Sequence, residues 1–102
     1  MIREIKNNDM TAIDQSKLAV VDFNAVWCGP CKMLGPVLAA LSEEMTDVDF
    51  FGVDVDENPV LSMNFSIHSV PTLILFKDGL EVDKMIGFTP KEELKKWIEE
   101  NR

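Results

Sequence analysis

The sequence predicts an α/β fold built on a central mixed β-sheet. Apolar runs of strand length alternate with helical patterns along the chain, in the order β-α-β-α-β-α-β-β-α. The β-α-β pattern at the start indicates a parallel pair of strands, because parallel strands need a crossover connection. The Asp78-Gly79 pair between the last two strands indicates a hairpin, which adds an antiparallel pair and makes the sheet mixed.

The first half of the chain is expected to contain two strands and two helices. Ile2 to Ile5 has the pattern of a short edge strand, and Asp9 to Lys17 that of a first helix. Leu18 to Ala25 is apolar on both of its alternating sides, which predicts a central strand buried on both faces. An apolar stripe at helical spacing follows the cysteines, and Pro36 predicts a kink there because it removes one backbone hydrogen bond.

The second half of the chain predicts three strands and a short helix before the final helix. Val48 to Val55 indicates a second buried strand, and the turn at residues 56–59 starts a short helix that ends near Phe65. Thr72 to Phe76 and Glu81 to Ile86 are the two strands of the hairpin. The sheet is therefore expected to have five strands.

The final helix is expected to begin at Thr89-Pro90. Thr89 has the position of a helix cap, Pro90 that of the first helical residue, and Glu92 stands three residues after the cap. Trp97 lies on the apolar stripe of this helix and is expected to pack in the core.

Length and charge limit the classes of function. We expect residues 1–102 to form a single domain and to act as a monomer. The formal net charge of −8 argues against nucleic acid as a partner, because nucleic-acid affinity depends on Lys and Arg. No apolar run approaches the roughly 18 residues that a membrane span needs, and no apolar signal region begins the chain. A cytoplasmic location is therefore expected, where a disulfide is transient rather than structural.

Both cysteines of the chain, Cys28 and Cys31, lie between a predicted strand and a predicted helix. Residues three apart on a helix have Cβ atoms about 5–6 Å from each other, so the two thiols can form a disulfide without moving the backbone. A C-x-x-C pair in this strand–turn–helix setting indicates a thiol–disulfide redox site. The alternative is a pair of small buried apolar residues, which is the commonest state of free cysteine.

A metal site is not expected. His68 is the only histidine, and with one cysteine pair it supplies three ligands at most, whereas structural zinc usually takes four. His68 is instead interpreted as a loop residue at the rim of the site.

Several motifs, in one order along nearly the whole chain, resemble the thioredoxin family. They are Val21-Asp22-Phe23, Trp27-Cys28-Gly29-Pro30-Cys31-Lys32, Pro36, Val53-Asp54-Val55-Asp56, Val70-Pro71-Thr72, Phe76-Lys77-Asp78-Gly79 and Gly87. The resemblance implies a thioredoxin-like fold with helices on both faces of the sheet. It also implies a dithiol carrier that reduces protein disulfides without a bound cofactor. The family's usual electron source is an NADPH-dependent flavoprotein, thioredoxin reductase, and a ferredoxin-linked reductase is the alternative.

The two cysteines are expected to have different roles. Cys28 is the predicted nucleophile, because a helix N-terminus favours the thiolate over the thiol. Its sulfur is expected to be exposed, and Cys31, one turn deeper, to be the resolving thiol. Pro30 restricts the spacer, and by family analogy the Gly29-Pro30 spacer goes with a reducing carrier.

Asp22 is the candidate proton acceptor. It shares a strand face with Leu18 and Val20, so we expect it to be buried beneath the dithiol. Burial disfavours the charged form and raises the pKa of a carboxyl, which suits Asp22 to take a proton from Cys31. The alternative is an acid at the end of a strand that reaches water.

The resemblance implies that the Val70–Pro71 bond is cis and lies beside the dithiol. The backbone of Val70 would then pair with an extended substrate segment. Three uncharged segments are expected to converge on the exposed sulfur, at residues 27–31, 69–71 and 86–88. They contain Trp27 and Gly87, which complete the predicted substrate-binding set.

Two positions depart from the family pattern. Asn24 stands where most members carry an aromatic residue, so the wall beside the dithiol should be smaller and wetter. Gly52 stands where many bacterial members have a Lys that pairs with the buried Asp, so we expect a higher pKa for Asp22 than in Lys-bearing relatives.

Two other functions are weighed. An isomerase or oxidant is disfavoured by the Gly-Pro spacer, and a binding module with incidental sulfurs would show no disulfide reductase activity.

Overall fold

A five-stranded mixed sheet and four helices make up the computed structural model, which describes residues 1–102. In chain order the elements are β1 (Ile2–Glu4), α1 (Thr11–Asp14), β2 (Leu18–Asn24), α2 (Gly29–Glu44), β3 (Asp49–Asp54), α3 (Pro59–Asn64), β4 (Thr72–Lys77), β5 (Leu80–Ile86) and α4 (Lys91–Glu100). This is the element order that the sequence predicts. None of the helices combines the length and the apolar character that crossing a membrane requires.

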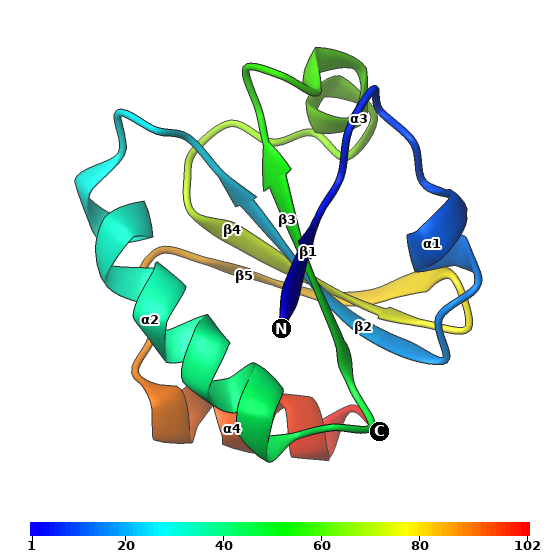
Figure 1. Cartoon of the computed structure of the whole chain (residues 1–102), viewed down its shortest axis with the longest axis vertical. Helices are drawn as coiled ribbons and strands as arrows, with labels where there is room; N and C mark the ends of the chain where they lie inside the picture. The colour runs from blue at the N-terminus through cyan, green and yellow to red at the C-terminus, as the bar shows by residue number, and fades with distance from the viewer.

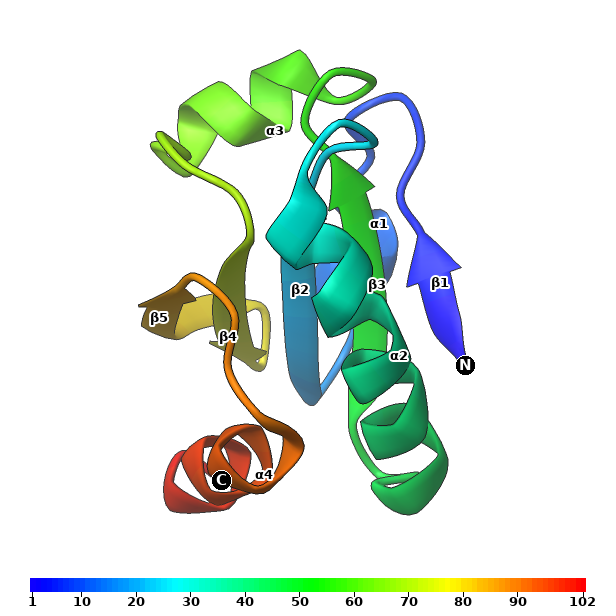
Figure 2. The ribbon, with the colours of Figure 1, turned by 90° about the vertical axis from the view of Figure 1, so that its left-hand side faces the viewer.

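The sheet has the strand order β1-β3-β2-β4-β5. β2 lies at its centre, parallel to β3 and antiparallel to β4, and β1 is a parallel edge strand next to β3. β4 and β5 form the antiparallel hairpin at the other edge. Helices α2 and α4 cover one face of the sheet, and α1 and α3 lie on the other (Figures 1 and 2). The predicted mixed sheet with helices on both faces is confirmed.

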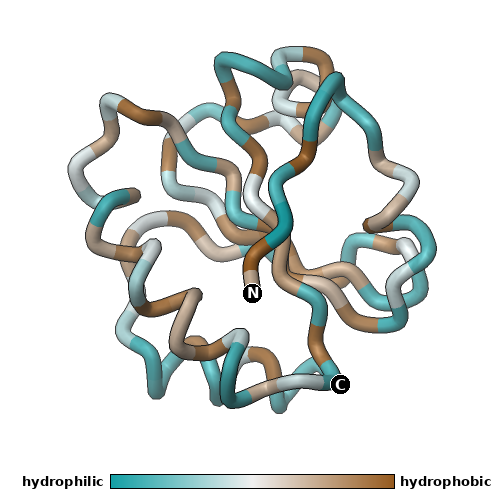
Figure 3. The backbone as a smooth tube through the Cα atoms, in the orientation of Figure 1, coloured by the Kyte–Doolittle hydropathy of each residue, from teal (hydrophilic) through white to brown (hydrophobic).

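The alternation of β2 sorts the core into two clusters, one on each face of the sheet. Leu18 and Val20 point to the α2 and α4 face, where they pack with apolar side chains of both helices. Ala19, Val21 and Phe23 point to the α1 and α3 face. Figure 3 shows apolar segments in the strands that cross the centre and hydrophilic segments on many of the outer turns. Burial of β2 on both faces is confirmed.

Helix α1 is shorter than the predicted range, Asp9 to Lys17. Asp9 stands before the helix, and its Oδ1 accepts the backbone N–H of Thr11 at 3.0 Å. At the other end, the carbonyl of Lys17 accepts the N–H of Asp78 at 2.9 Å, so the chain has already turned toward the sheet. The flanking residues therefore use their hydrogen-bonding groups outside the helix.

Helix α4 does not have the predicted Thr89 cap. Pro90 is extended, with ψ 155°, and its carbonyl accepts the first helical bond, from Leu94 N at 3.0 Å. Pro90 is therefore the cap residue, and the Thr89 hydroxyl donates to Met85 Sδ at 3.1 Å instead. Trp97 is buried on this helix, as predicted, and its Nε1 donates to Asp83 at 2.7 Å.

The hairpin turn and helix α2 form where the sequence predicts them. Asp78 and Gly79 both have positive φ, 52° and 82°, which is the geometry that an Asp-Gly hairpin turn needs. Helix α2 continues through Pro36 as one element, and its N-terminus lies beyond the carboxyl end of β2. This connection places the cysteine segment at one end of the central strand.

Candidate dithiol site

The two cysteines form a disulfide at the start of α2. Their Cα atoms are 5.3 Å apart, within the range that a disulfide needs. Cys28 is the cap residue of the helix, in extended conformation, and its Sγ accepts the backbone N–H of Cys31 at 3.2 Å. Gly29 and Pro30 form the first helical residues. A thiolate at Cys28 would therefore receive a hydrogen bond and the positive end of the helix dipole.

Both sulfur-bearing residues are buried in the disulfide form. Cys28 is 4% exposed and Cys31 is 7% exposed. The expectation that the Cys28 sulfur is exposed is therefore wrong for this form. The reason is local packing, since Ala25, Val55 and Val70 contact the pair and shield it from solvent.

Three chain segments meet at the disulfide. Cys28 Sγ lies 3.6 Å from the carbonyl oxygen of Val70, which a thiol at this position could reach as a donor. The Val70–Pro71 peptide bond is cis. The carbonyl of Pro71 accepts the N–H of Gly87 at 2.8 Å, and Gly87 has φ +92°, a conformation that favours glycine. The segments at residues 28–31, 70–71 and 87 are thus linked.

Exposed apolar side chains flank this junction. Trp27 is 67% exposed, and Ile86 and Phe88 are also exposed although both are large and apolar. The indole Nε1 of Trp27 donates to Asp56 at 2.9 Å, which holds the ring at the surface. His68 lines a shallow pocket beside Trp27 and Val70, as expected for a rim residue. No group of three or more His, Cys, Asp or Glu is arranged to hold a metal ion.

Asp22 is buried on β2, as predicted, and only 7% of its surface is exposed. Its Oδ1 has no hydrogen-bond partner, and its Oδ2 accepts the Asn24 amide at 3.4 Å. Burial raises the pKa of Asp22 to about 7, against the lowering effect of the Asn24 amide, and the charge of Glu4 raises it further. A group with this pKa can take up and release a proton near neutral pH.

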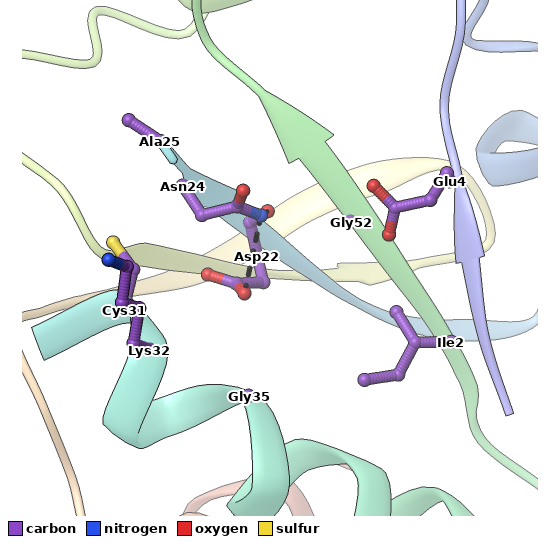
Figure 4. A pocket seen from close by; sticks show the side chains of 9 residues that line it. All are labelled: Ile2, Glu4, Asp22, Asn24, Ala25, Cys31, Lys32, Gly35 and Gly52. Atoms are coloured by element: carbon purple, nitrogen blue, oxygen red, sulfur yellow. Dashed lines mark hydrogen bonds between the residues drawn. The ribbon is translucent and has the colours of Figure 1, made fainter. Parts of the chain in front are cut away.

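A cavity of about 260 Å³ connects Asp22 with the dithiol. Its lining residues come from β1, β2, the residue after β2, α2 and β3 and are Ile2, Glu4, Asp22, Asn24, Ala25, Cys31, Lys32, Gly35 and Gly52. Figure 4 shows the carboxyl of Asp22 and the sulfur of Cys31 on the same side of this space. Small or polar residues form much of the wall, so water can reach Asp22 and carry protons.

Two residues of the site were not predicted from the sequence. Asp56 bonds the exposed indole, although the sequence predicts only uncharged segments around the sulfur. Glu4 reaches the cavity of Asp22 from an edge strand that precedes it by 18 positions in the sequence. Neither has a local signal, because each depends on the pairing of distant strands and loops. The register of β1 on β3 is what identifies Glu4.

A disulfide at a helix N-terminus, a cis-proline segment against it and a buried acid behind it define a thiol–disulfide oxidoreductase of the thioredoxin fold. Comparison with known proteins gives the family. The thioredoxin family model matches residues 3–100. The chain is 53% identical to a thioredoxin of Staphylococcus haemolyticus over 81 residues, 78% of each chain.

A thioredoxin of Chlamydia trachomatis is 42% identical to the chain over 102 residues, the full length of both. Among solved structures, the thioredoxin of Fasciola hepatica superposes with a TM-score of 0.89 at 34% identity, covering 99% of this chain and 100% of the other. The chain belongs to the thioredoxin family. It is a thiol–disulfide electron carrier, which makes it a protein-disulfide oxidoreductase.

Proposed function

We propose that this carrier works as a reductant, with Cys28 as the nucleophile and Cys31 as the resolving thiol. The observation that carries the assignment is the cap geometry, in which the N–H of Cys31 points at Cys28 Sγ from 3.2 Å. A charge-assisted hydrogen bond of this kind, at the positive end of a helix, stabilises thiolate at position 28 and not at position 31.

The reaction transfers two electrons in two exchanges. The Cys28 thiolate attacks a substrate disulfide, so that one substrate sulfur leaves as thiolate and a mixed disulfide forms. Cys31 gives up its proton, and its thiolate attacks Cys28 Sγ, which releases the second substrate sulfur and closes the Cys28–Cys31 disulfide. The substrate disulfide is reduced and the dithiol is oxidised.

Asp22 is the proposed acceptor of the Cys31 proton. It lines the same cavity as Cys31, and its raised pKa, about 7, suits a group that exchanges a proton at neutral pH. The cavity gives water access to both groups. Asp22 acts on the second exchange, because only that exchange requires deprotonation of the buried thiol.

The proposed substrate platform combines Trp27, Val70, Pro71 and Gly87 around the sulfur. An extended substrate segment would pair with the backbone of Val70, as a strand adds to a sheet edge, and its apolar side chains would lie on the exposed indole. Gly29 and Pro30 support the turn between the cysteines. Backbone pairing and apolar contact recognise little of the sequence, so many protein disulfides can serve as substrates.

The proposed electron source is thioredoxin reductase, an NADPH-dependent flavoprotein, with a ferredoxin-linked enzyme as the alternative. We propose that the chain binds no cofactor itself, since the sulfur chemistry is complete with two cysteines and an acid. The chain is proposed to act as a single-domain monomer in the cytoplasm. The bacterial relatives named thioredoxin support the proposed reductase and the proposed location.

The assignment is tested by insulin-disulfide reduction with dithiothreitol. The wild-type chain should accelerate insulin reduction, and Cys28→Ser should lower the rate to that of dithiothreitol alone. Cys31→Ser is the matched variant, and it should accumulate a mixed disulfide with the substrate that mass spectrometry detects. Wild-type activity in Cys28→Ser, or trapping through position 31 in place of 28, would contradict the roles assigned to the two thiols.

A further inference from the structure

Glu4, Gly52 and Asp22 form one row across three neighbouring strands. Glu4 pairs with Gly52 in the parallel ladder of β1 and β3, and Asp22 pairs with Gly52 in that of β2 and β3. Paired residues of a sheet point to the same face, so the two carboxyl groups stand on one face with the glycine between them. The two carboxyls are separated by two strand spacings, about 10 Å between Cα atoms.

Gly52 leaves the middle of this row free, and the side chain of Glu4 fills it. A Cβ built at Gly52 would lie 3.0 Å from Glu4 Cδ and 3.2 Å from Glu4 Oε1. Glu4 therefore leans over the glycine toward Asp22, instead of extending along the sheet edge. Figure 4 shows its carboxylate beside Gly52, pointing from β1 toward the cavity that Asp22 also lines.

The other groups around Asp22 do not cancel the negative charge of Glu4. Lys32 of α2 also lines the cavity, but its charge is not among the causes that shift the pKa of Asp22, whereas the charge of Glu4 is. Asp54 of β3 uses its Oδ1 to accept the N–H groups of Asp56 and Glu57 at the strand end. β4 contributes the apolar Leu73 next to Asp22, and α2 contributes Cys31, which is uncharged in the disulfide.

We propose that Glu4 is a positioning residue for the proton step, whose carboxylate, reaching over Gly52, makes Asp22 a stronger base toward the Cys31 proton. A like charge disfavours ionisation of its neighbour, and the repulsion here acts across the partly solvated cavity that both groups line. Burial is the largest cause of the raised pKa of Asp22, and the charge of Glu4 raises it further, which agrees with this role. The consequence for Cys31 rests on the proposed function, because it requires Asp22 to be the proton acceptor.

The coupling is tested by NMR titration of the Asp22 carboxyl in the oxidised protein. Glu4→Gln should lower the Asp22 midpoint by about half a pH unit, because it removes one negative charge across a partly solvated path. Gly52→Lys should lower the Asp22 midpoint further, because it adds a cation to the same row. The flexible end of the Glu4 side chain can move aside to make room for the new side chain. Glu4 is exposed, so Glu4→Gln is expected to fold.

Glu81→Gln is the matched control, because Glu81 is an exposed carboxylate on β5, the opposite edge strand, and its loss changes the net charge equally. It should leave the Asp22 midpoint unchanged. An Asp22 midpoint in Glu4→Gln that equals the wild-type value, or that falls equally in Glu81→Gln, would overturn the proposal.

A kinetic measurement separates this proposal from the proposed function. In Glu4→Gln the pH profile of the resolving exchange should move to lower pH, together with the Asp22 midpoint. If Asp22→Asn leaves that exchange unchanged, the role of Asp22 in the proposed function fails, while the NMR titration still decides whether Glu4 controls its proton.

Discussion

The two faces of β2 show how one strand supports both stability and chemistry. On the α1 and α3 face, Phe23 and its neighbours are fully buried, and the ring of Phe65 packs against Phe23 and Phe76. On the α2 and α4 face, Leu18 and Val20 are also buried in a core cluster, but that cluster does not include Asp22. From there to the dithiol the space holds a cavity lined by small and polar residues.

The difference teaches that the site occupies the place where close packing stops. Filling the α1 and α3 face stabilises the sheet that holds every functional group. The dithiol end of the other face costs stability, because the carboxyl of Asp22 is buried there and its Oδ1 has no hydrogen-bond partner. That same arrangement raises the pKa of Asp22 to about 7. Substitutions on the two faces should therefore have opposite consequences.

The largest effect is expected from Phe51→Ala on the filled face. Phe51 is 1% exposed and packs in the α1 and α3 cluster, so its truncation leaves a cavity. We expect a loss of about 3–5 kcal/mol in the free energy of unfolding, measured by urea denaturation. Phe88→Ala is the control, because Phe88 is 41% exposed and should cost far less. Equal losses in the two variants would show that the filled face carries no special share of the stability.

Asp22→Asn should stabilise the protein, in a pH-dependent manner. The folded-state pKa of Asp22 is raised from 3.8 to about 7, so the folded state binds the proton more tightly than the unfolded state. The stability that this group contributes is complete below about pH 4 and is lost as the pH rises through 7. At about 1.4 kcal/mol per pH unit, the loss reaches up to about 4 kcal/mol, an upper limit because the cavity is open to water.

Urea denaturation of the oxidised protein at pH 4 and pH 8 measures this difference. Asp22→Asn should match the wild type at pH 4 and exceed it at pH 8, and Glu81→Gln should keep the wild-type difference between the two pH values. If Asp22→Asn gained no stability at pH 8, the buried carboxyl would not be the cost of the open face.

The smallest effect is expected from Gly35→Ala, on the helix that borders the cavity. A Cβ at Gly35 would meet no atom within 4 Å beyond its chain neighbours and the backbone of its own helix, and the residue lies inside α2. Alanine should therefore raise the free energy of unfolding by about 0.5–1 kcal/mol through helix propensity alone. The wild-type rate of insulin reduction should remain. A loss of stability would mean that this side of the cavity is closed.

Local patterns were sufficient to predict most of the fold. The alternation along Leu18 to Asn24, the apolar stripe of α2 and the Asp78-Gly79 turn each depend on neighbouring residues, and the structure has all three. Predictions failed at element ends. Thr89 does not cap α4 and α1 is short, because the hydrogen-bonding groups at those ends find partners outside the helix.

The sequence alone determined which residues can do the chemistry, since the cysteine spacing, the spacer and the face of Asp22 are local properties of the chain. Only the tertiary structure decided how they are surrounded. Strand pairing brought Glu4 over Gly52 toward Asp22, and the packing of Ala25, Val55 and Val70 buried Cys28. Burial and the electrostatic field at a carboxyl or a sulfur depend on atoms from distant parts of the chain, which no local pattern specifies.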